Sequence, residues 1–556
     1  MKNSDKKLKH EFFISREWFL VVFLLVICLY LFVFKLGDTS LWETDEPIYG
    51  DVARGILRFG DWITLRFNYR EWFDKPPLYF WFTALFYRFF GWNEFTTRIT
   101  SSLFGMTHVV LVYFLGRVLF NKRVGFFSAL ILATSLQFIV QSRLALVDVP
   151  LSFFISLSFL FFYLGYTNPD RRNYYILSAA SMGFATLTKG PIGFLLPGFI
   201  ILIYLTLTRN LHRLKAMRVP WMVLIFLAIA APWYIIEFLR HGWIFVEQLF
   251  FLRMVTRFAT PFEGHTGPVY YYFAVLILGF FPWSSFLPLA FFHFLRRSKD
   301  KTAKEREKHF FLLIWIALIF IFFSLSQSKL PGYIFPLYPA CALSVGWLWD
   351  KFATSKLPAQ SKGLYISFGF FFVIVLALMT ALTFIGKTLF PDEYALFGNA
   401  VLLAIFGLLG AGVFSFVFII FKRKIFLSLL TLVAGMCIFL WILLVHILPF
   451  TEVFKPTKFF AHEIKSVIQP GEKIVDYPVT PGHDISFNCS LVYYSEHPVL
   501  GVSNVENLKE LFSSGERVYA VMDIEDYHGI KEELEGISLY TLNKRGGKIL
   551  LSNKQN

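Results

Sequence analysis

Acidic and basic side chains gather between residues 42 and 77 of an otherwise apolar chain. The segment opens with Trp-Glu-Thr-Asp-Glu-Pro-Ile-Tyr and closes with Phe-Asp-Lys-Pro-Pro, directly behind the first membrane-length apolar run. It holds seven acidic and five basic residues, although only 16 % of the chain is charged. Such clusters at a membrane surface more often build a site that handles charged groups than serve solubility alone.

Two adjacent acids, Asp45 and Glu46, are the first candidates for chemistry. They precede a proline and a stretch over 48–59 whose apolar spacing is helical, which places them at a helix N-terminus. They are either a helix cap or acids that act on a metal or a polarised substrate, and we expect a catalytic role. Asp148, in Leu-Val-Asp-Val-Pro between two apolar runs, either caps the next helix or joins this acidic site.

Three lysines stand beside turns that contain proline. Asp74-Lys75-Pro-Pro places a carboxylate and an ammonium on adjacent residues before a turn, as a local salt bridge or as a phosphate-binding lysine at the membrane plane. Lys329-Leu-Pro-Gly-Tyr333 repeats a cation, a rigid turn and a hydroxyl. Lys189, in Thr-Lys-Gly-Pro, is expected to be a snorkelling lysine at a tight turn.

One histidine, His265, lies in the glycine-rich stretch Glu-Gly-His-Thr-Gly-Pro. A lone histidine is more often structural than a ligand, but beside outer-face acids its imidazole could complete a mixed histidine–carboxylate metal site. The four cysteines are scattered and have neither a disulfide framework nor metal-type spacing.

The composition is that of a polytopic membrane protein. The chain has 556 residues, is 56 % hydrophobic and has a mean hydropathy of +0.58. Apolar runs of roughly 17 to 25 residues recur, and each is long enough to cross about 30 Å of hydrocarbon as a helix. The net charge of +15 lies mostly in short basic loops, so it indicates membrane orientation and not nucleic-acid binding.

With the basic amino terminus inside, an uncleaved first span delivers the charged segment to the outer face. We interpret Pro76–Phe90 as an amphipathic helix on the membrane, because a full span there would place basic loops outside. About thirteen spans result, over about 18–35, 99–120, 124–141, 149–166, 173–188, 190–208, 220–238, 268–295, 309–326, 332–349, 364–386, 397–421 and 425–447.

This pattern predicts two domains. Residues 1–450 form the transmembrane domain, with catalytic loops 37–98, 240–267 and 327–333 on the outer side, and 451–556 form a small soluble α/β domain. The expected helices of that domain are 459–467, 505–512 and 523–534, and the expected strands are 473–477, 490–494, 517–522 and 548–551.

Seven motifs then occur in one order: Asp-Glu-Pro-x-Tyr, Phe-Asp-Lys-Pro-Pro-Leu, Asn-Glu-Phe-x-x-Arg, Asp-x-Pro-Leu, Thr-Lys-Gly-Pro, Glu-Gly-His-x-Gly-Pro and Ser-Lys-Leu-Pro-x-Tyr. Together they resemble the aminoarabinose transferase (ArnT-like) and protein O-mannosyltransferase-like glycosyltransferases. These are GT-C membrane enzymes of glycosyltransferase family 83. The resemblance covers about residues 15–350, and the rest of the chain matches in general plan only.

The resemblance implies a GT-C fold of about thirteen spans, juxtamembrane helices in the first outer loop, and a polyprenyl-phosphate-sugar donor. It implies that Asp45 is the essential acid and that Lys75 and Tyr333 hold the donor phosphate. On physical grounds independent of the resemblance, the charges of Lys75 and Lys329 would neutralise that phosphate as it leaves. The family's phosphate-binding arginine has Arg257 as one counterpart here. Asp74 and His265 would bind a divalent metal, with zinc as the candidate ion, although the family usually has the longer glutamate at position 74.

The leading hypothesis is a bacterial inner-membrane glycosyltransferase with a cytoplasmic amino terminus and a periplasmic active site and C-terminal domain. It moves one sugar from a polyprenyl phosphate to lipid A or a related envelope acceptor, by inverting displacement. We expect a monomer whose other partner is the lipid bilayer, without nucleic acid. One alternative is an enzyme that glycosylates Ser or Thr of proteins. Another is a lipid-linked-sugar flippase, which would need charges at mid-membrane, whereas here the acids cluster at one surface.

Overall fold

The chain is mostly helical and divides into two compact units. The computed structural model describes residues 17–168, 170–256, 266–296, 303–358, 361–389, 391–421, 424–479 and 488–555. The first unit, here the helical unit, comprises Met1–Leu36, Asp74–Tyr79 and Ile99–Ile447. The second, here the mixed unit, comprises Gly37–Phe73, Phe80–Arg98 and Leu448–Asn556.

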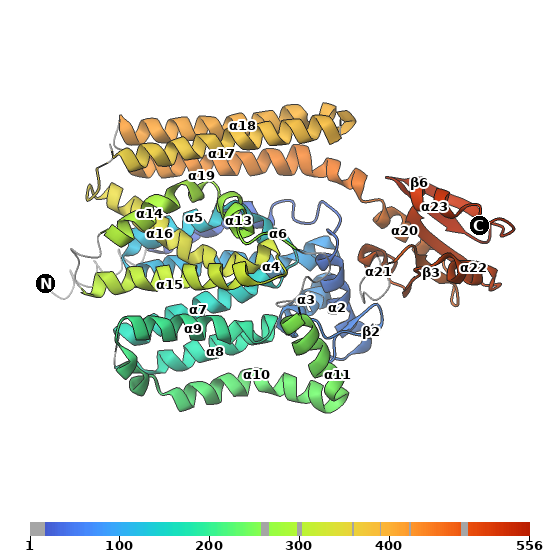
Figure 1. The fold of residues 1–556 in the computed structure, drawn as a ribbon, viewed down its shortest axis with the longest axis horizontal. Coiled ribbons are helices and arrows are strands. Elements are labelled where there is room, and N and C mark those ends of the chain that lie inside the picture. Colours follow the sequence, from blue (N-terminus) through green and yellow to red (C-terminus); the bar gives the residue numbers. More distant parts are fainter. Residues whose placement is uncertain are drawn as a thin grey trace. The chain divides into compact units, whose positions relative to one another are not determined.

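Apolar helices of varied length make up most of the helical unit (Figure 1). They are Glu17–Val33, which ends in the π-turn η1 (Leu29–Val33), α4 (Glu94–Leu119), α5 (Lys122–Ala133), α6 (Leu136–Arg143), α7 (Asp148–Thr167), α8 (Asn173–Lys189), α9 (Ile192–Leu207), α10 (Val219–His241), α13 (Tyr271–Gly279), α14 (Leu287–Arg296), α15 (Ala303–Leu325), α16 (Tyr338–Ala353), α17 (Lys362–Leu389), α18 (Pro391–Ile420) and α19 (Ile425–Ile442). Shorter elements are η2 (Leu211–Met217), α11 (Trp243–Val246), η3 (Glu247–Thr256), η4 (Trp283–Phe286), η5 (Pro331–Leu337) and η6 (Leu443–Ile447).

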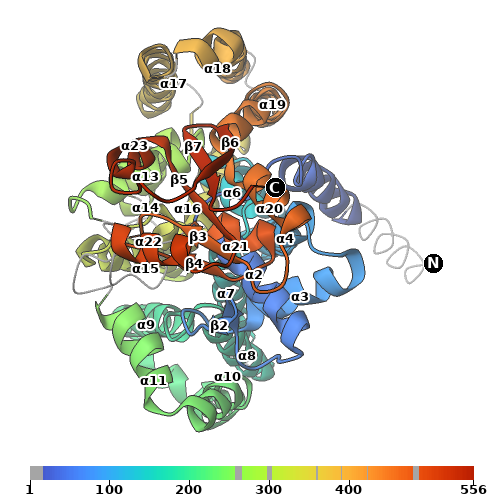
Figure 2. The ribbon, with the colours of Figure 1, turned by 90° about the vertical axis from the view of Figure 1, so that its right-hand side faces the viewer.

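Seven of these helices are long and apolar enough to cross a membrane, or up to nine if two bent pairs each count as one span, within the described residues. Each such helix satisfies its own backbone hydrogen bonds, which the hydrocarbon of a bilayer requires. The chain is therefore a multi-pass membrane protein. In Figures 1 and 2, α17, α18 and α19 lie side by side, and α8 lies beside α7 and α10.

Two predicted spans are broken. The expected run over 124–141 bends by 64° between α5 and α6, and the run over 268–295 bends by 109° between α13 and Trp283–Arg296. The two breaks contact each other, because the Leu136 N–H donates to the Phe281 carbonyl at 3.0 Å. The Trp283 indole also donates to Thr134 Oγ1 at 3.0 Å. Tertiary hydrogen bonds thus satisfy groups that a straight helix would satisfy internally.

The first loop contributes helices to the mixed unit. α2 (Asp45–Phe59) begins at the predicted acidic pair and ends at Gly60, whose φ of 67° suits a residue without a side chain. A short hairpin, β1 (Arg66–Phe67) with β2 (Arg70–Glu71), follows. α3 (Leu78–Phe90) matches the helix expected over 76–90.

The C-terminal residues form a five-stranded mixed sheet in the order β4-β3-β5-β7-β6. Its strands are β3 (Lys473–Asp476), β4 (Val499–Gly501), β5 (Val518–Asp523), β6 (Tyr540–Arg545) and β7 (Lys548–Ser552). β4, β3 and β5 are parallel, and β7 pairs antiparallel with β5 and β6. The associated helices are η7 (Leu448–Phe454), α20 (Thr457–Val467), α21 (Cys489–Ser495), α22 (Val505–Ser513) and α23 (Ile524–Ile530).

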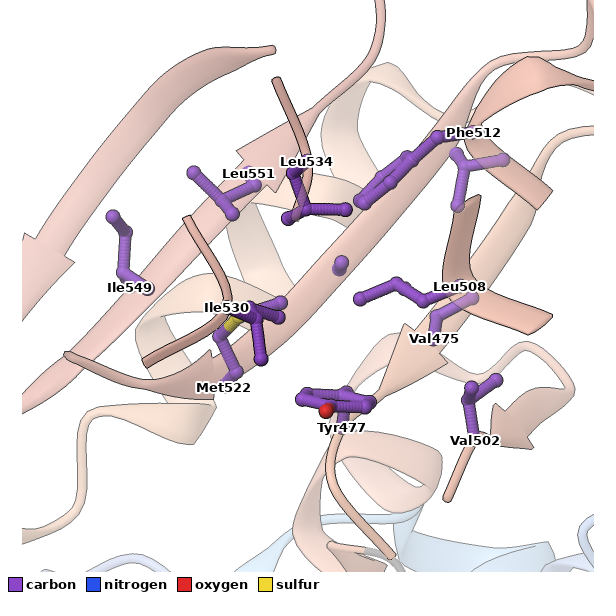
Figure 3. Packing of buried hydrophobic residues seen from close by; sticks show 12 residues of the cluster. Val475, Tyr477, Val502, Leu508, Phe512, Met522, Ile530, Leu534, Ile549 and Leu551 are labelled. Carbon is purple, nitrogen blue, oxygen red and sulfur yellow. The ribbon is translucent and has the colours of Figure 1, made fainter. Parts of the chain in front are cut away.

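An apolar core holds this sheet and its helices together (Figure 3). Val475, Leu508, Phe512, Val518 and Leu551 are each at most 4 % exposed. Burying each such side chain contributes about 1.5 to 3 kcal/mol relative to leaving it in water.

One expected strand is a helix. The strand predicted over 490–494 is wrong, because these residues lie in α21, where the side chain of Asn488 caps the helix by accepting from the Leu491 N–H. All of α21 is buried, and a short, fully buried apolar run has no periodicity that distinguishes a strand from a helix.

The first loop and the C-terminal residues pack together inside the mixed unit. Asn68 exchanges two hydrogen bonds with the backbone of Val499, each 2.9 Å long. Arg54 donates to the Tyr493 carbonyl at 2.8 Å while pairing with Asp51 at 2.5 Å. The domain boundary predicted at 450/451 stays a prediction. The compact mixed unit contains residues from both sides of it.

A buried carboxylate gives a stability prediction. Burial raises the pKa of Asp476 to about 6, although the Asn488 N–H donates to its carboxylate. The folded state therefore binds more protons than the unfolded state between about pH 4 and 6, so stability falls as pH rises through that window. Asp476→Asn should stabilise the mixed unit by about 2 to 3 kcal/mol at pH 7, with no gain near pH 4.

Two measurements on the full-length protein test this effect. One is hydrogen exchange of the β3 and β5 amides at pH 7, and the other is thermal unfolding at pH values down to 4. The control is Asp523→Asn, because Asp523 ends the neighbouring strand but its side chain is 55 % exposed and pairs with Lys548. A gain equal in both variants, or one independent of pH, would contradict the assignment.

Candidate functional site

Three side chains that belong to the sequence motifs, those of Asp148, Lys189 and Tyr333, lie close together in the helical unit. Asp148 is the first residue of α7, and Lys189 is the last residue of α8. The Lys189 ammonium lies 2.5 Å from Asp148 Oδ1 and 5.3 Å from the centre of the Tyr333 ring, which η5 supplies. A carboxylate, an ammonium and a phenol are thus grouped at the ends of three separate elements.

The backbone around this group is fixed by buried polar contacts. Ser101 Oγ donates to the Leu146 carbonyl and accepts from the Leu146 N–H, both at 3.0 Å, which fixes the turn before α7. Gln137 donates to the Pro331 carbonyl at 2.7 Å and so fixes the start of η5. A Cβ at Gly332 would lie 3.3 Å from Asp148 Oδ2, so only glycine lets η5 approach the carboxylate without a shift.

Lys329 lies in the loop that leads into η5. Its ammonium donates to the carbonyls of Ser324 and Ser326, at 2.9 and 2.7 Å, and stands 5.6 Å from the centre of the Tyr272 ring. The residue is 4 % exposed, and burial lowers the pKa of its ammonium. The two carbonyls are neutral and do not balance the charge of this buried ammonium, which therefore attracts an anion.

The predicted pair Asp74 and Lys75 belongs to the same helical unit. The Lys75 ammonium lies 3.3 Å from the backbone carbonyl of Asp74, and both residues are half-buried. Their position before Pro76 and Pro77 agrees with the rigid turn that the sequence indicates.

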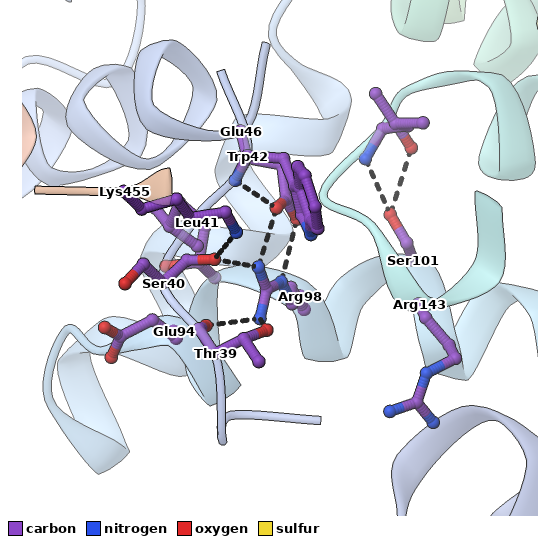
Figure 4. Close-up of polar contacts among 12 residues, drawn as sticks. Thr39, Ser40, Leu41, Trp42, Glu46, Glu94, Arg98, Ser101, Arg143 and Lys455 are labelled. Carbon is purple, nitrogen blue, oxygen red and sulfur yellow. Dashed lines mark hydrogen bonds and ion pairs between the residues drawn. The ribbon is translucent and has the colours of Figure 1, made fainter. Parts of the chain in front are cut away.

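The predicted acids Asp45 and Glu46 belong to the mixed unit and open α2. Asp45 is exposed, whereas Glu46 is 2 % exposed and forms a two-pronged ion pair with Arg98, at 2.9 Å to Nε and 2.8 Å to Nη2 (Figure 4). Glu46 also accepts from the Trp42 N–H at 2.9 Å. These contacts give Glu46 a buried positioning role beside Asp45, while its catalytic role stays a prediction.

Two predicted site residues, Arg257 and His265, lie outside the described residues. Within the described part of the chain, no group of three or more His, Cys, Asp or Glu side chains is arranged to hold a metal ion. The predicted metal pair Asp74 and His265 therefore stays a prediction.

Two contributing residues escaped sequence reasoning. Lys189 was expected to snorkel, but it pairs with Asp148, and its motif Thr-Lys-Gly-Pro was the available signal. In the sequence, Arg98 is noticeable only as the last residue of Asn-Glu-Phe-x-x-Arg. Its partner Glu46 is 52 residues away, so no local pattern indicates that the arginine is buried and paired.

Comparison with known proteins identifies the class. Residues 74–236 match the family described as dolichyl-phosphate-mannose-protein mannosyltransferase. The crystal structure of ArnT from Cupriavidus metallidurans bound to undecaprenyl phosphate superposes with a TM-score of 0.82, covers 96 % of this chain and 98 % of that one, and is 23 % identical. The fold is thus the GT-C fold of membrane glycosyltransferases.

Sequence relatives narrow this class to a family. An uncharacterised protein of Aquifex aeolicus is 32 % identical over 375 residues, which are 67 % of this chain and 71 % of the relative. The undecaprenyl phosphate-alpha-4-amino-4-deoxy-L-arabinose arabinosyl transferase of Pseudomonas aeruginosa is 32 % identical over 330 residues, 58 % of each chain. The chain belongs to the ArnT-like and protein O-mannosyltransferase-like family of glycosyltransferases.

The Asp148–Lys189 pair gives a second prediction. Both side chains are largely buried, at 13 % and 19 % exposed, so removing one partner leaves the other charge uncompensated. Asp148→Asn and Lys189→Met should each destabilise the helical unit, and the double variant should lose less than the sum, with a coupling of roughly 1 to 3 kcal/mol.

Thermal unfolding of the four proteins in one detergent measures this coupling. The control cycle uses Glu17 and Lys122, an ion pair whose side chains are 24 % and 33 % exposed and which should couple by less than about 1 kcal/mol. Strict additivity at Asp148 and Lys189 would show that the pair makes no net contribution.

Proposed function

We propose that this glycosyltransferase takes its sugar from a polyprenyl-phosphate carrier and transfers it to lipid A or a related envelope acceptor. The acceptor attacks the anomeric carbon from the side opposite the carrier phosphate, so the configuration there is inverted. Relatives named undecaprenyl phosphate-alpha-4-amino-4-deoxy-L-arabinose arabinosyl transferases support a donor sugar carried on a polyprenyl phosphate.

One observation carries the donor assignment: cations and a phenol gather at the helix ends around η5. Lys189 contacts the Tyr333 ring face and Asp148, while Lys329 stands four residues before Tyr333. A sugar phosphate ester leaves as a phosphate anion, and ammonium groups already in position stabilise that developing charge without reorganisation. Lys75 and Arg257 are proposed to bind the same phosphate.

The proposed acid is Asp45. If the acceptor is a hydroxyl, the Asp45 carboxylate takes its proton as the acceptor oxygen bonds to the sugar and the carrier phosphate departs. If the acceptor is a lipid A phosphate, it is already an anion and Asp45 orients the reacting groups. Its place at the N-terminus of α2 favours the ionised carboxylate that both roles need.

The topology belongs to the same proposal. About thirteen spans, a cytoplasmic amino terminus and a periplasmic active site with the 451–556 segment outside follow from the distribution of basic loops. An inner membrane location and a monomeric enzyme complete the proposal. Beside the seven long helices, the two bent pairs and the shorter helices Glu17–Val33, α8, α9 and α16 are the candidates for the remaining spans, and Trp243–Leu252 lies in the proposed outer loop 240–267.

A second acceptor class rests on the family match to dolichyl-phosphate-mannose-protein mannosyltransferases over 74–236. A protein acceptor would present a Ser or Thr hydroxyl, for which Asp45 would serve as general base. The donor half of the reaction is the same in both cases.

Asp45→Asn should abolish transfer, by about 10²-fold or more, while the protein still folds and inserts. Mass spectrometry of the lipid A and glycoprotein fractions, from cells with wild-type, Asp45→Asn or no copy of the gene, reads out both acceptors at once. Asp61→Asn, in the same loop, is the matched control. Wild-type transfer by the Asp45→Asn enzyme would remove Asp45 from the mechanism, and unchanged fractions on deletion would remove both acceptors.

The proposed metal has a separate test. Asp74 and His265 are the proposed ligands, so His265→Ala and chelation of the purified wild-type enzyme should each lower transfer by at least about tenfold, and zinc should restore only the chelated wild type. Bound zinc is measured by elemental analysis of the purified protein. Near-full activity of chelated His265→Ala would exclude an essential metal at these residues.

A further inference from the structure

A segment of five residues, Thr39–Glu43, leads from the first helix to Asp45, and backbone groups of Thr39, Ser40 and Leu41 bond to side chains from elsewhere in the mixed unit. Every hydrogen-bonding group of Ser40 is used. Its N–H and hydroxyl donate to the two carboxylate oxygens of Glu452, the former at 2.9 Å. Its carbonyl accepts from Arg98 and from Lys455, both at 2.9 Å.

The neighbouring residues are held in the same way. The Leu41 N–H donates to the Tyr494 hydroxyl at 2.8 Å, and Glu43 accepts from the Ser490 N–H at 2.9 Å. The Lys455 ammonium stands 3.5 Å from the centre of the Trp42 ring, in a cation–π contact (Figure 4). Four of the partners of this segment come from the C-terminal residues: Glu452, Lys455, Ser490 and Tyr494.

We infer that the C-terminal residues of this chain position the Asp45 loop for sugar transfer, with Lys455 as the central positioning residue. This inference rests on the proposed role of Asp45. Asp45 follows the held segment by two residues, so the direction from which its carboxylate enters the reaction depends on where Ser40 and Trp42 are fixed. A displacement of about 1 Å at a reacting group lowers a rate by about 10²-fold.

The contacts of the Lys455 ammonium with the Thr39–Glu43 segment should depend on pH. Its side chain is 13 % exposed, and burial together with nearby Arg98 lowers the pKa of its ammonium to about 8, against the opposing charges of Glu452, Glu46 and Glu43. Below pH 8 the ammonium binds the Ser40 carbonyl and the Trp42 ring. As the pH rises through 8 the cation is lost, and with it the cation–π contact.

The test uses three variants of the full-length enzyme, with undecaprenyl phosphate-linked 4-amino-4-deoxy-L-arabinose as donor and purified lipid A as acceptor. Lys455→Met should lower kcat at pH 7 by about tenfold or more, with the donor KM changed less than about twofold. Lys455→Arg should recover most of the rate. The matched control, Lys465→Met, removes a more exposed lysine that pairs with Glu496 and should leave kcat unchanged.

The pH profile separates positioning from a merely structural role. Wild type and Lys465→Met should lose kcat above pH 8, whereas Lys455→Arg should keep it to about pH 10, because a guanidinium stays protonated there. Wild-type kcat in Lys455→Met, or an alkaline loss at pH 8 that persists in Lys455→Arg, would overturn the inference.

Hydrogen exchange distinguishes this failure from failure of the proposed function. Lys455→Met should speed exchange in a peptide covering 39–46 and leave the β3 and β5 amides unchanged, whatever the substrate is. Unchanged exchange over 39–46 overturns the inference. Full activity of Asp45→Asn overturns instead the proposed role of Asp45 on which the inference rests.

Discussion

A buried guanidinium–carboxylate pair fixes the chain where the first helix gives way to α2. Arg98 and Glu46 are each 2 % exposed, so both charges have lost their hydration, and only the contacts around them offset that cost. Hydrogen bonds to the guanidinium and the carboxylate replace the lost hydration. The guanidinium meets both oxygens of Glu46 and also donates to the carbonyls of Thr39 and Ser40. Removing either partner alone would leave the other charge buried, at a cost of about 3 to 5 kcal/mol.

The helical unit uses the same principle with less burial. Asp148 and Lys189 stand at the beginning of one helix and the end of another, where exposed peptide groups favour an anion and a cation respectively. Each charge is therefore stabilised by its own helix before the two pair. The close approach of Gly332 then brings Tyr333 into contact with the cation. The ends of α7, α8 and η5, with the close approach at Gly332, thus bring together three polar side chains that lie far apart in the sequence.

Structural features with a local cause can be predicted from the sequence. The start of α2 at Asp45 follows from two acids before a proline and an amphipathic stretch, and the helices over 149–166 and 364–386 follow from apolar length alone. Features that depend on a partner far away in the sequence cannot be predicted in this way. The break after Ala133 is stabilised by Phe281 and Trp283, and α21 is a helix because Asn488 caps it and the rest of the unit buries it.

The same distinction between local causes and distant partners applies to the residues of the candidate site. The sequence offers Asp45, Asp148, Lys75, Lys329 and Tyr333 as candidates because each is a charged or phenolic residue beside a turn in an apolar chain. Arg98 and Lys189 contribute through partners 52 and 41 residues away, which no window of sequence contains. The roles of individual residues are therefore less predictable than their presence, because a role is set by the atoms that a side chain meets.

The long separation of partners has a consequence for how the Asp45 loop forms. Ser40 and Glu452 are 412 residues apart, and Leu41 and Tyr494 are 453 apart, so these contacts close among the longest loops in the chain. Such contacts form late, because their loop-closure entropy is lost before the bonds stabilise the product. The loop that precedes Asp45 consequently reaches its final geometry only after the last hundred or so residues have been synthesised and folded, since chains of this size fold part by part. A nascent or truncated chain can thus insert its helices while Thr39–Glu43 still lacks Glu452, Lys455, Ser490 and Tyr494. This order couples completion of the Asp45 loop to completion of the whole chain.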